Sequence, residues 1–374
     1  MRLEPFQLER YFGQYEFAVP FPLAASDCDG LSLAELLSLA DDETRALWES
    51  LALGYTETQG HPLLRQEIAA LYDGCDPAQV LVAAPEELIF LALNCLVYNG
   101  DHVVCTFPAY QSLYSIAESV HAEVSRWEPD EAAGWRFDPR RLAELVRPST
   151  RLIVVNFPHN PTGALPDFDD YARILEIAAS HGITVFSDEM YRLLEQRDGD
   201  RLPAAFEVHE RAVTLSGVSK TLGLAGLRIG WLVVRDQRLM RRLVQLKDYT
   251  TICSSAPSEI LAIAGLRARE TILARHRERI ARNLGLLEGF MGKYEPLFSW
   301  VPPRAGTVCF PRFKPDSLGT SEFCKLVREE AGVMLAPSAV FDYGERHLRI
   351  GVGRENFPDG LLALSAFLTS RRAS

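Results

Sequence analysis

The stretch 215-LSGVSKTLGLAGLRIGW-231 places one lysine and one arginine in the most constrained part of the chain. An apolar, β-branched run ends directly before Lys220, which predicts a buried strand that stops at the lysine. Arg228 follows between two glycines, in a segment of small residues where a backbone turns tightly or approaches a ligand closely. A tight turn by itself requires neither charge, so the partners of Lys220 and Arg228 decide how the stretch is interpreted.

The stretch belongs to a series of short apolar runs that alternate with helical patterns. The runs cover residues 79–84, 101–107, 123–128, 151–157, 183–191, 212–219 and 229–235. Between them lie segments such as 167-DFDDYARILEIAASHG-182, whose apolar residues recur every three or four positions. This alternation predicts an α/β fold, with a large domain built on a mostly parallel seven-stranded sheet covered by helices.

After about residue 260 the pattern changes to that of a smaller α+β domain. A long charged helix is expected over 267–294, strand–turn–strand over 297–313, a helix over 320–332 and a final strand over 346–352. We therefore expect three parts: an N-terminal segment 1–30 that joins the small domain, a large cofactor-binding domain 31–265, and a small C-terminal domain 266–374.

Composition excludes several classes of protein. The formal net charge of −11 argues against a nucleic acid as the main partner. The seven cysteines are odd in number and form no C-x-x-C pair, which favours reduced, buried thiols and no metal site. The N-terminus has no apolar signal-peptide core, and no run reaches the ~18 apolar residues of a membrane span. We expect a soluble cytoplasmic protein.

Polar and aromatic residues follow several of the predicted strands. In an open α/β sheet, ligands bind beyond the carboxyl ends of the strands. The residues at these ends are Tyr110, Asn160, Asp188, Tyr191 and Lys220. Each alone has an ordinary explanation, such as turn chemistry for an asparagine or a helix cap for an aspartate. Together, and with an arginine nearby, they predict a ligand that is polar, planar and anionic.

Pyridoxal phosphate meets this description. A lysine amine forms a Schiff base with its aldehyde, and a carboxylate facing the ring nitrogen keeps that nitrogen protonated so that the ring accepts electrons. An aromatic side chain holds the flat ring, while an arginine and the free N–H groups of a helix start bind the phosphate.

The sequence resembles the fold-type I, class I/II pyridoxal-phosphate-dependent aminotransferases over nearly its whole length. The resemblance rests on six motifs in the family's order: GYTETQGHPLLRQEI (54–68), FPAYQSLY (107–114), NFPHNPTG (156–163), SDEMY (187–191), the stretch 215–231, and HLRIGVG (347–353). It implies pyridoxal 5'-phosphate as cofactor, an amino acid and a 2-oxo acid as substrates, and a homodimer with shared active sites.

The resemblance implies a role for each residue around the cofactor ring. Lys220 matches the lysine that binds the cofactor covalently and moves the substrate's proton, and Asp188 matches the partner of the ring nitrogen. Asn160 and Tyr191 match donors to the ring hydroxyl, and Tyr110 matches the aromatic residue stacked on the ring.

Other matches concern the phosphate and the substrate. Arg228 and Ser219 match phosphate ligands, and Tyr55 matches a tyrosine that reaches the phosphate from the partner subunit. Arg349 matches the arginine that binds the substrate's α-carboxylate.

Two positions depart from the family's pattern. The position three before the lysine often carries a hydroxyl and here is Gly217, and the phosphate-binding turn reads AAPEELIF (83–90). Because proline has no N–H, we expect a helix to begin at Pro85 or Glu86 and the Glu86 amide, with that of Glu87, to bind the phosphate. The Glu86 carboxylate is then expected to turn outward, and Ser216 to help at the phosphate.

Three functions remain open from the sequence. The first is transamination, and the second is another reaction of the same cofactor: elimination, decarboxylation, or replacement with cyclisation. The segments 8–17, 27–37 and 306–313 resemble a branch that includes enzymes similar to capreomycidine synthase, which cyclise a hydroxylated arginine. The third is a non-catalytic sensor domain, which needs a DNA-binding segment that we do not expect before the helix at 5–12. The roles of His61 and of residues 26–30 stay open from the sequence.

Overall fold

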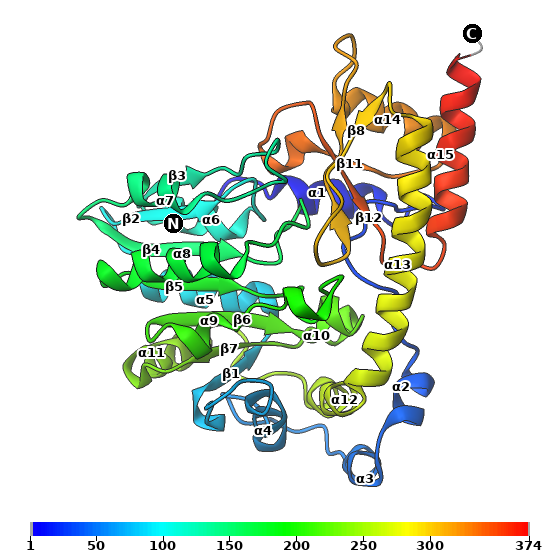
Figure 1. The fold of residues 1–374 in the computed structure, drawn as a ribbon. Coiled ribbons are helices and arrows are strands. Elements are labelled where there is room, and N and C mark those ends of the chain that lie inside the picture. Colours follow the sequence, from blue (N-terminus) through cyan, green and yellow to red (C-terminus); the bar gives the residue numbers. More distant parts are fainter. Residues whose placement is uncertain (1–2, 373–374) are drawn as a thin grey trace.

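The computed structural model describes residues 3–372. Its centre is a seven-stranded sheet in the order β1-β7-β6-β5-β4-β2-β3 (Figure 1). The strands are β1 (Val80–Ala83), β2 (His102–Thr106), β3 (Glu123–Trp127), β4 (Thr150–Asn156), β5 (Thr184–Asp188), β6 (Ala212–Gly217) and β7 (Gly230–Val234). All pairs are parallel except those that β7 makes with β1 and β6. The predicted fold class and all seven predicted strands are confirmed.

Helices bury both faces of this sheet, which is why its strands read as continuous apolar runs. Side chains alternate along each strand: in β7, Leu232 and Val234 join the core under α5 (Pro85–Leu96), α6 (Ser112–Ser119) and α11 (Gln237–Lys247). Trp231 and Val233 face the other way, toward α4 (Pro62–Ala69) and α12 (Ala256–Arg267). Farther along the sheet, α7 (Pro139–Leu145) and α8 (Phe168–Ser180) cover that second face.

The C-terminal part contains α13 (Arg269–Lys293), β8 (Phe298–Ser299), β9 (Val308–Cys309), β10 (Arg312–Phe313), α14 (Thr320–Ala331), β11 (Ala336–Pro337), β12 (Leu348–Gly351) and α15 (Phe357–Arg372). Its strands form a β10-β8 pair and a β11-β12-β9 sheet. Helix α13 runs alongside α15 (Figure 1). The expected helices and the final strand are present, whereas α15 was not among the predicted elements.

The N-terminal segment lies against this C-terminal part. Phe21 bridges Val333, the Ala24 amide donates to Met334 O at 2.8 Å, and the Gly351 amide donates to Leu23 O at 2.6 Å. These contacts support our division of the chain at residues 30 and 265, which stays a proposal. Among the described residues, no helix has both the length and the apolar character that crossing a bilayer requires.

The remaining helices are short. They are α1 (Gln7–Tyr15), α2 (Leu33–Leu39), α3 (Asp42–Glu49), α9 (Ala205–Val208) and α10 (Val218–Thr221), with single 3₁₀ turns at η1 (Pro77–Gln79), η2 (Asp198–Asp200), η3 (Ala225–Leu227) and η4 (Ser338–Phe341). Two of them position the site: α10 carries Lys220 directly after β6, and α1 closes one side of a cavity above the strand ends.

Candidate functional site

A cavity of about 470 Å³ lies at the carboxyl ends of β4, β5 and β6, within the size range of small-molecule sites. Most of the residues expected from the sequence line it: Tyr110, Asn160, Asp188, Tyr191, Ser219, Lys220, Arg228, Arg349 and Glu86. Tyr55 does not line it. The parallel sheet thus brings together side chains that are far apart in the sequence.

Lys220 lies at the floor of this cavity on the single turn of α10. Its Nζ donates to Ser26 Oγ at 2.9 Å. Burial lowers the pKa of Lys220; the carboxylate of Asp27 opposes this shift, while the guanidinium groups of Arg349 and Arg228 reinforce it. A lysine with a lowered pKa is more often neutral at physiological pH, and the neutral amine is the nucleophile.

Asp188 ends β5 and is buried. Its Oδ1 accepts from the Met190 amide at 3.1 Å, which fixes the carboxyl group. Burial raises the pKa of Asp188 to about 7, with the Met190 hydrogen bond acting in the opposite direction. A protonated ring nitrogen placed against this group would restore its ionised form, because an opposite charge nearby favours the carboxylate.

Asn156 connects two of the expected residues and was not singled out from the sequence. Its Nδ2 donates to the backbone oxygen of Asp188 at 3.0 Å, and its Oδ1 accepts from the Asn160 amide at 2.7 Å. It therefore sets the distance between the residues expected at the ring nitrogen and at the ring hydroxyl. The available signal was its place as a polar residue near the end of the apolar run 151–157, four positions before Asn160.

Arg349 reaches the cavity from β12 and is buried. Its Nε and Nη2 donate to Ala24 O at 3.2 and 2.9 Å, and its Nη1 donates to Asn160 Oδ1 at 3.1 Å. A guanidinium has five N–H groups, so donors on Nη1 and Nη2 remain for a carboxylate. The side-chain Nδ2 of Asn160 donates to no other described residue, so its N–H groups also remain for a ligand.

The two tyrosines are held by residues of the N-terminal segment. The Tyr191 hydroxyl donates to Ser26 O at 3.1 Å, and burial raises its pKa to about 12. The Tyr110 hydroxyl donates to Glu9 Oε1 at 2.7 Å, and its ring centroid lies 4.8 Å from that of Phe6. Both hydroxyls thus have partners within the chain.

One corner of the cavity has the features of an anion site. Ser219 Oγ is buried and has no hydrogen-bond partner among the described residues, which is rare for a buried hydroxyl. Helix α5 begins at Pro85, as expected, and no described residue accepts from the amides of Glu86 and Glu87. Arg228 also lines this cavity, with its side chain largely exposed. A phosphate would satisfy the hydroxyl and both amides.

The expectation that the Glu86 carboxylate turns outward is wrong. It lies on the cavity wall, where its Oε2 accepts from Ser112 Oγ at 3.1 Å. Burial raises the pKa of Glu86 to about 7, whereas the Ser112 hydrogen bond lowers it. A carboxyl group that is partly protonated near neutral pH repels a phosphate less than a full charge would.

The departure at Gly217 has a steric reason. A Cβ there would lie 3.0 Å from Gly230 Cα and 3.1 Å from Ile229 O, so a side chain at this position would crowd the backbone of the neighbouring strand. Ser216 does not replace it: its side chain lies on the other side of β6, where Oγ approaches Glu189 O at 3.4 Å. The expected role of Ser216 at the phosphate is therefore wrong.

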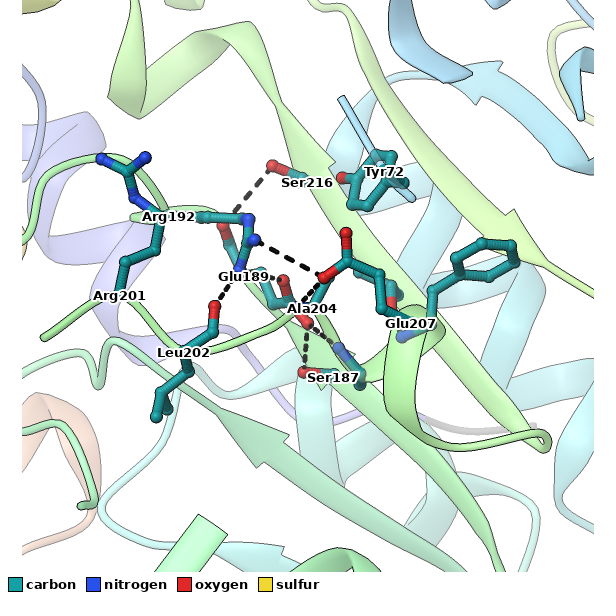
Figure 2. Close-up of polar contacts among 12 residues, drawn as sticks. Tyr72, Ser187, Glu189, Arg192, Arg201, Leu202, Ala204, Glu207 and Ser216 are labelled. Atoms are coloured by element: carbon teal, nitrogen blue, oxygen red, sulfur yellow. Dashed lines mark hydrogen bonds and ion pairs between the residues drawn. The ribbon is translucent and has the colours of Figure 1, made fainter. Parts of the chain in front are cut away.

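A buried polar cluster supports the site from behind the sheet (Figure 2). Glu189 directly follows Asp188, and its Oε1 accepts from Ser187 Oγ at 3.0 Å and from the Ala205 amide at 2.9 Å. Arg192 lies 3.6 Å from Glu189 Oε2 and donates to Leu202 O at 2.7 Å. These contacts fix the segment after β5 and hence the position of Asp188. Beyond the acid pair in SDEMY, no pattern in the sequence indicates this role.

Tyr55 is 89% exposed and lies outside the cavity of its own chain. Leu53 and Tyr249 are exposed to a similar degree. His61 caps α4, with its Nδ1 accepting from the Leu63 amide at 3.2 Å, so its role is structural. In the segment 26–30, Ser26 and Asp27 line the cavity. No group of three or more His, Cys, Asp or Glu in residues 3–372 is arranged to hold a metal.

Different residues of the cavity suit different steps of the chemistry. Pyridoxal phosphate supplies, when bound, a ring that accepts the electron pair left on the substrate's Cα. Lys220 would supply an amine for the cofactor's aldehyde and for the proton at Cα. Asp188 would hold a proton on the ring nitrogen, Arg349 would orient an α-carboxylate, and Ser219 with the start of α5 would bind the phosphate.

Comparisons with known proteins agree with this geometry. The family model "Aminotransferase class I and II" matches residues 20–356. A pyridoxal-phosphate-dependent aminotransferase from Streptococcus suis 89-1591 superposes with a TM-score of 0.92 at 31% identity, covering 99% of both chains.

Two curated relatives lie at lower identity. The chain is 28% identical over 356 residues to capreomycidine synthase of Streptomyces vinaceus, covering 95% of this chain and 86% of that one. It is 27% identical over 312 residues to aspartate aminotransferase of Pyrococcus horikoshii, covering 79% and 78%. The family match spans most of the chain. The Ser219 hydroxyl and the first α5 amides, which have no partner among residues 3–372, suit the family's cofactor. The protein thus belongs to the class I and II aminotransferases, with pyridoxal 5'-phosphate as its cofactor.

Proposed function

We propose that the protein is an aminotransferase (EC 2.6.1) that transfers an amino group between an amino acid and a 2-oxo acid. The observation that carries the proposal is the single cavity shared by Lys220, Asp188 and Arg349. Both substrates of such a reaction, the amino acid and the 2-oxo acid, carry an α-carboxylate. One arginine with unused donors can therefore bind the substrate in both half-reactions. The half-buried Lys220 supplies the base for the proton at Cα.

We also propose that the enzyme works as a cytoplasmic homodimer with shared sites. Tyr55 supports this assignment because it is exposed in its own chain while resembling a residue that reaches the partner's phosphate. Leu53 and Tyr249 provide further exposed apolar area, which a partner subunit would cover.

The test is a panel of amino acids mixed with the purified, cofactor-loaded protein. Transamination yields one 2-oxo acid and one pyridoxamine phosphate per site, and added 2-oxo acid regenerates the starting cofactor. Lys220→Ala is the matched control and should give neither product. Release of ammonia without pyridoxamine phosphate would contradict transamination.

A second candidate is a replacement reaction with ring closure. The observation that favours it is the 28% identity to capreomycidine synthase over 95% of the chain. The same cavity residues serve both reactions, so products decide between them. Ring closure leaves the amino group in the product and forms no 2-oxo acid, which mass spectrometry of the same mixtures detects.

A further inference from the structure

One wall of the cavity is formed by α1 together with residues 26–27, and its carboxylates are not among the residues expected to bind the cofactor. Glu9, Phe12 and Glu16 follow one another at spacings of three and four residues, so they lie on one side of α1 and its end, and all line the cavity. Asp27 joins them from the following segment. The N-terminal segment thus adds three acids to the site.

This wall lies beside the arginine expected to bind the α-carboxylate. The guanidinium carbon of Arg349 is 5.3 Å from the centroid of the Phe12 ring. Glu9 precedes Phe12 by about one helical turn and Glu16 follows it by about one turn. A substrate whose carboxylate rests on Arg349 therefore lies next to both glutamates.

Four cations line the cavity, but within residues 3–372 the ion pairs of these acids are made by Arg354 alone. Arg354 Nη2 lies 2.8 Å from Asp27 Oδ1, so this guanidinium is already paired. Its 3.8 Å contact is the one ion pair of Glu16 within residues 3–372, and Glu16 accepts no hydrogen bond there. Burial raises the pKa of Glu16, and the neighbouring Asp27 raises it further, with Arg354 opposing.

Glu9 likewise has few hydrogen-bond partners among the described residues. In the described part of the chain, the Tyr110 hydroxyl is its one hydrogen-bond donor, at 2.7 Å. A neutral phenol compensates a partly buried carboxylate less well than a cation does. An acidic substrate side chain would add a further negative charge to this wall. Arg354 would not compensate it, because Arg354 is already paired with Asp27.

We infer that the substrate carries a cationic side chain, an ammonium or a guanidinium, and that Glu16 and Glu9 bind it. The inference rests on the proposed function in one respect, because it takes the substrate's α-carboxylate to lie on Arg349. With the α-carboxylate on Arg349 and Asp27 paired with Arg354, the two glutamates are the acids of this wall that remain for the side chain. Specificity then follows from the cost of leaving these carboxylates without a partner when a neutral analogue binds.

The test compares isosteric ligands by titration calorimetry with the cofactor-loaded enzyme at neutral pH. L-Arginine is paired with L-citrulline, in which a neutral urea replaces the guanidinium, and L-ornithine with L-norvaline, which lacks the terminal amine. The cationic member of at least one pair should bind about tenfold or more tightly. The better pair identifies the cation as guanidinium or ammonium.

Substitutions then assign the preference to residues. Glu16→Gln should reduce the affinity ratio within the preferred pair several-fold, and Glu9→Gln/Glu16→Gln should bring it close to one. Glu49→Gln, on the exposed side of α3, is the matched control and should leave the ratio unchanged. Glu16→Asp retains the charge and should keep most of the preference, which separates charge from packing if the glutamine variants melt early.

Equal affinity within both pairs, or tighter binding of L-glutamate than of L-glutamine, would overturn the inference. So would a preference that survives the double substitution. Calorimetry records binding whether or not any product forms, which separates this inference from the proposed function. Conversion of neutral amino acids without a cation preference contradicts the inference alone, whereas a cation preference without any 2-oxo acid contradicts transamination alone.

Discussion

The ring of Pro85 lies against the backbone of Gly230. A Cβ built on Gly230 would be 2.8 Å from Pro85 Cγ and 2.9 Å from Ser216 O. The proline that removes one N–H from the phosphate corner therefore also seats the start of α5 on β7. The proline without an N–H and the glycine without a side chain therefore belong to one packing arrangement, which fixes the start of α5 beside the cavity.

Gly230→Ala tests this arrangement. The added methyl group must push Pro85 away, which we expect to lower the free energy of unfolding by about 1–3 kcal/mol and to weaken cofactor affinity, because the α5 amides move with the proline. Gly226→Ala is the control, since no atom lies within 4 Å of its new Cβ. Chemical unfolding and a fluorescence titration with pyridoxal phosphate measure the two effects. Equal effects of the two substitutions would show that the contact is unimportant.

Asp188→Asn should separate cofactor attachment from turnover. Lys220 remains in place, so borohydride reduction and peptide mapping should still find the cofactor on Lys220. Turnover should fall by about 100-fold or more, because a neutral amide no longer keeps the cofactor's ring nitrogen protonated and the ring then accepts electrons poorly. A cofactor label on another lysine would remove Lys220 from the site, and near-normal turnover would remove Asp188 from the ring nitrogen.

Arg349→Lys should weaken substrate binding while leaving the cofactor unaffected. An ammonium cannot form the two parallel N–H bonds that a guanidinium gives to a carboxylate, and it loses the contacts to Ala24 and Asn160. We expect KM for amino acids to rise about 10- to 100-fold, in line with one lost charged hydrogen bond. The cofactor's absorbance spectrum serves as the internal control. An unchanged KM for every substrate would contradict the assignment.

Mixing two variants tests the shared site. Lys220→Ala lacks the essential amine, and Tyr55→Phe lacks the hydroxyl offered to the partner. If Tyr55 acts across the interface, a mixed dimer contains one site with both defects and one with neither. Refolding the mixture should therefore raise cofactor affinity and activity above those of either variant alone. A monomer by sedimentation at micromolar concentration would rule out this arrangement.

Glu86→Gln should change the pH dependence of the cofactor-free protein. Burial raises the pKa of Glu86 to about 7 from an ordinary value of 4.5. Between these values the folded state holds a proton that the unfolded state has lost, so the wild type loses stability as pH rises from about 4.5 to 7. The variant should lose less over this range, as measured by urea unfolding at several pH values. Parallel curves for the two proteins would show that Glu86 does not titrate in this range.

The strands and most of the site could be predicted because their signals are local. Several apolar runs end at or just before a polar residue, and the carboxyl ends of parallel strands meet at one edge. Asp188 and Lys220 follow from this rule alone. The start of α5 at Pro85 was also predictable, since proline suits the first helical position and has no N–H to lose there.

The partners supplied by distant segments could not be predicted in this way. Ser26, which accepts from Lys220, is 194 positions away in sequence, and Glu9, which accepts from Tyr110, is 101 positions away. Nothing near Lys220 in sequence indicates either residue. The placement of Glu86 was misjudged for the same reason, because its hydrogen bond to Ser112 depends on how α5 packs against α6.

The α/β fold, the cofactor and the residues expected at its ring could be inferred from the chain alone, because hydrophobic period, strand ends and ordered motifs are local properties. The residues of the N-terminal segment in the cavity became visible only in the folded chain. Helix α1 and residues 26–27 reach the cavity through contacts with the C-terminal part of the chain, such as that between Arg349 and Ala24. Such contacts depend on how segments pack in space, and a linear pattern does not encode which distant carboxylates come to lie beside an arginine.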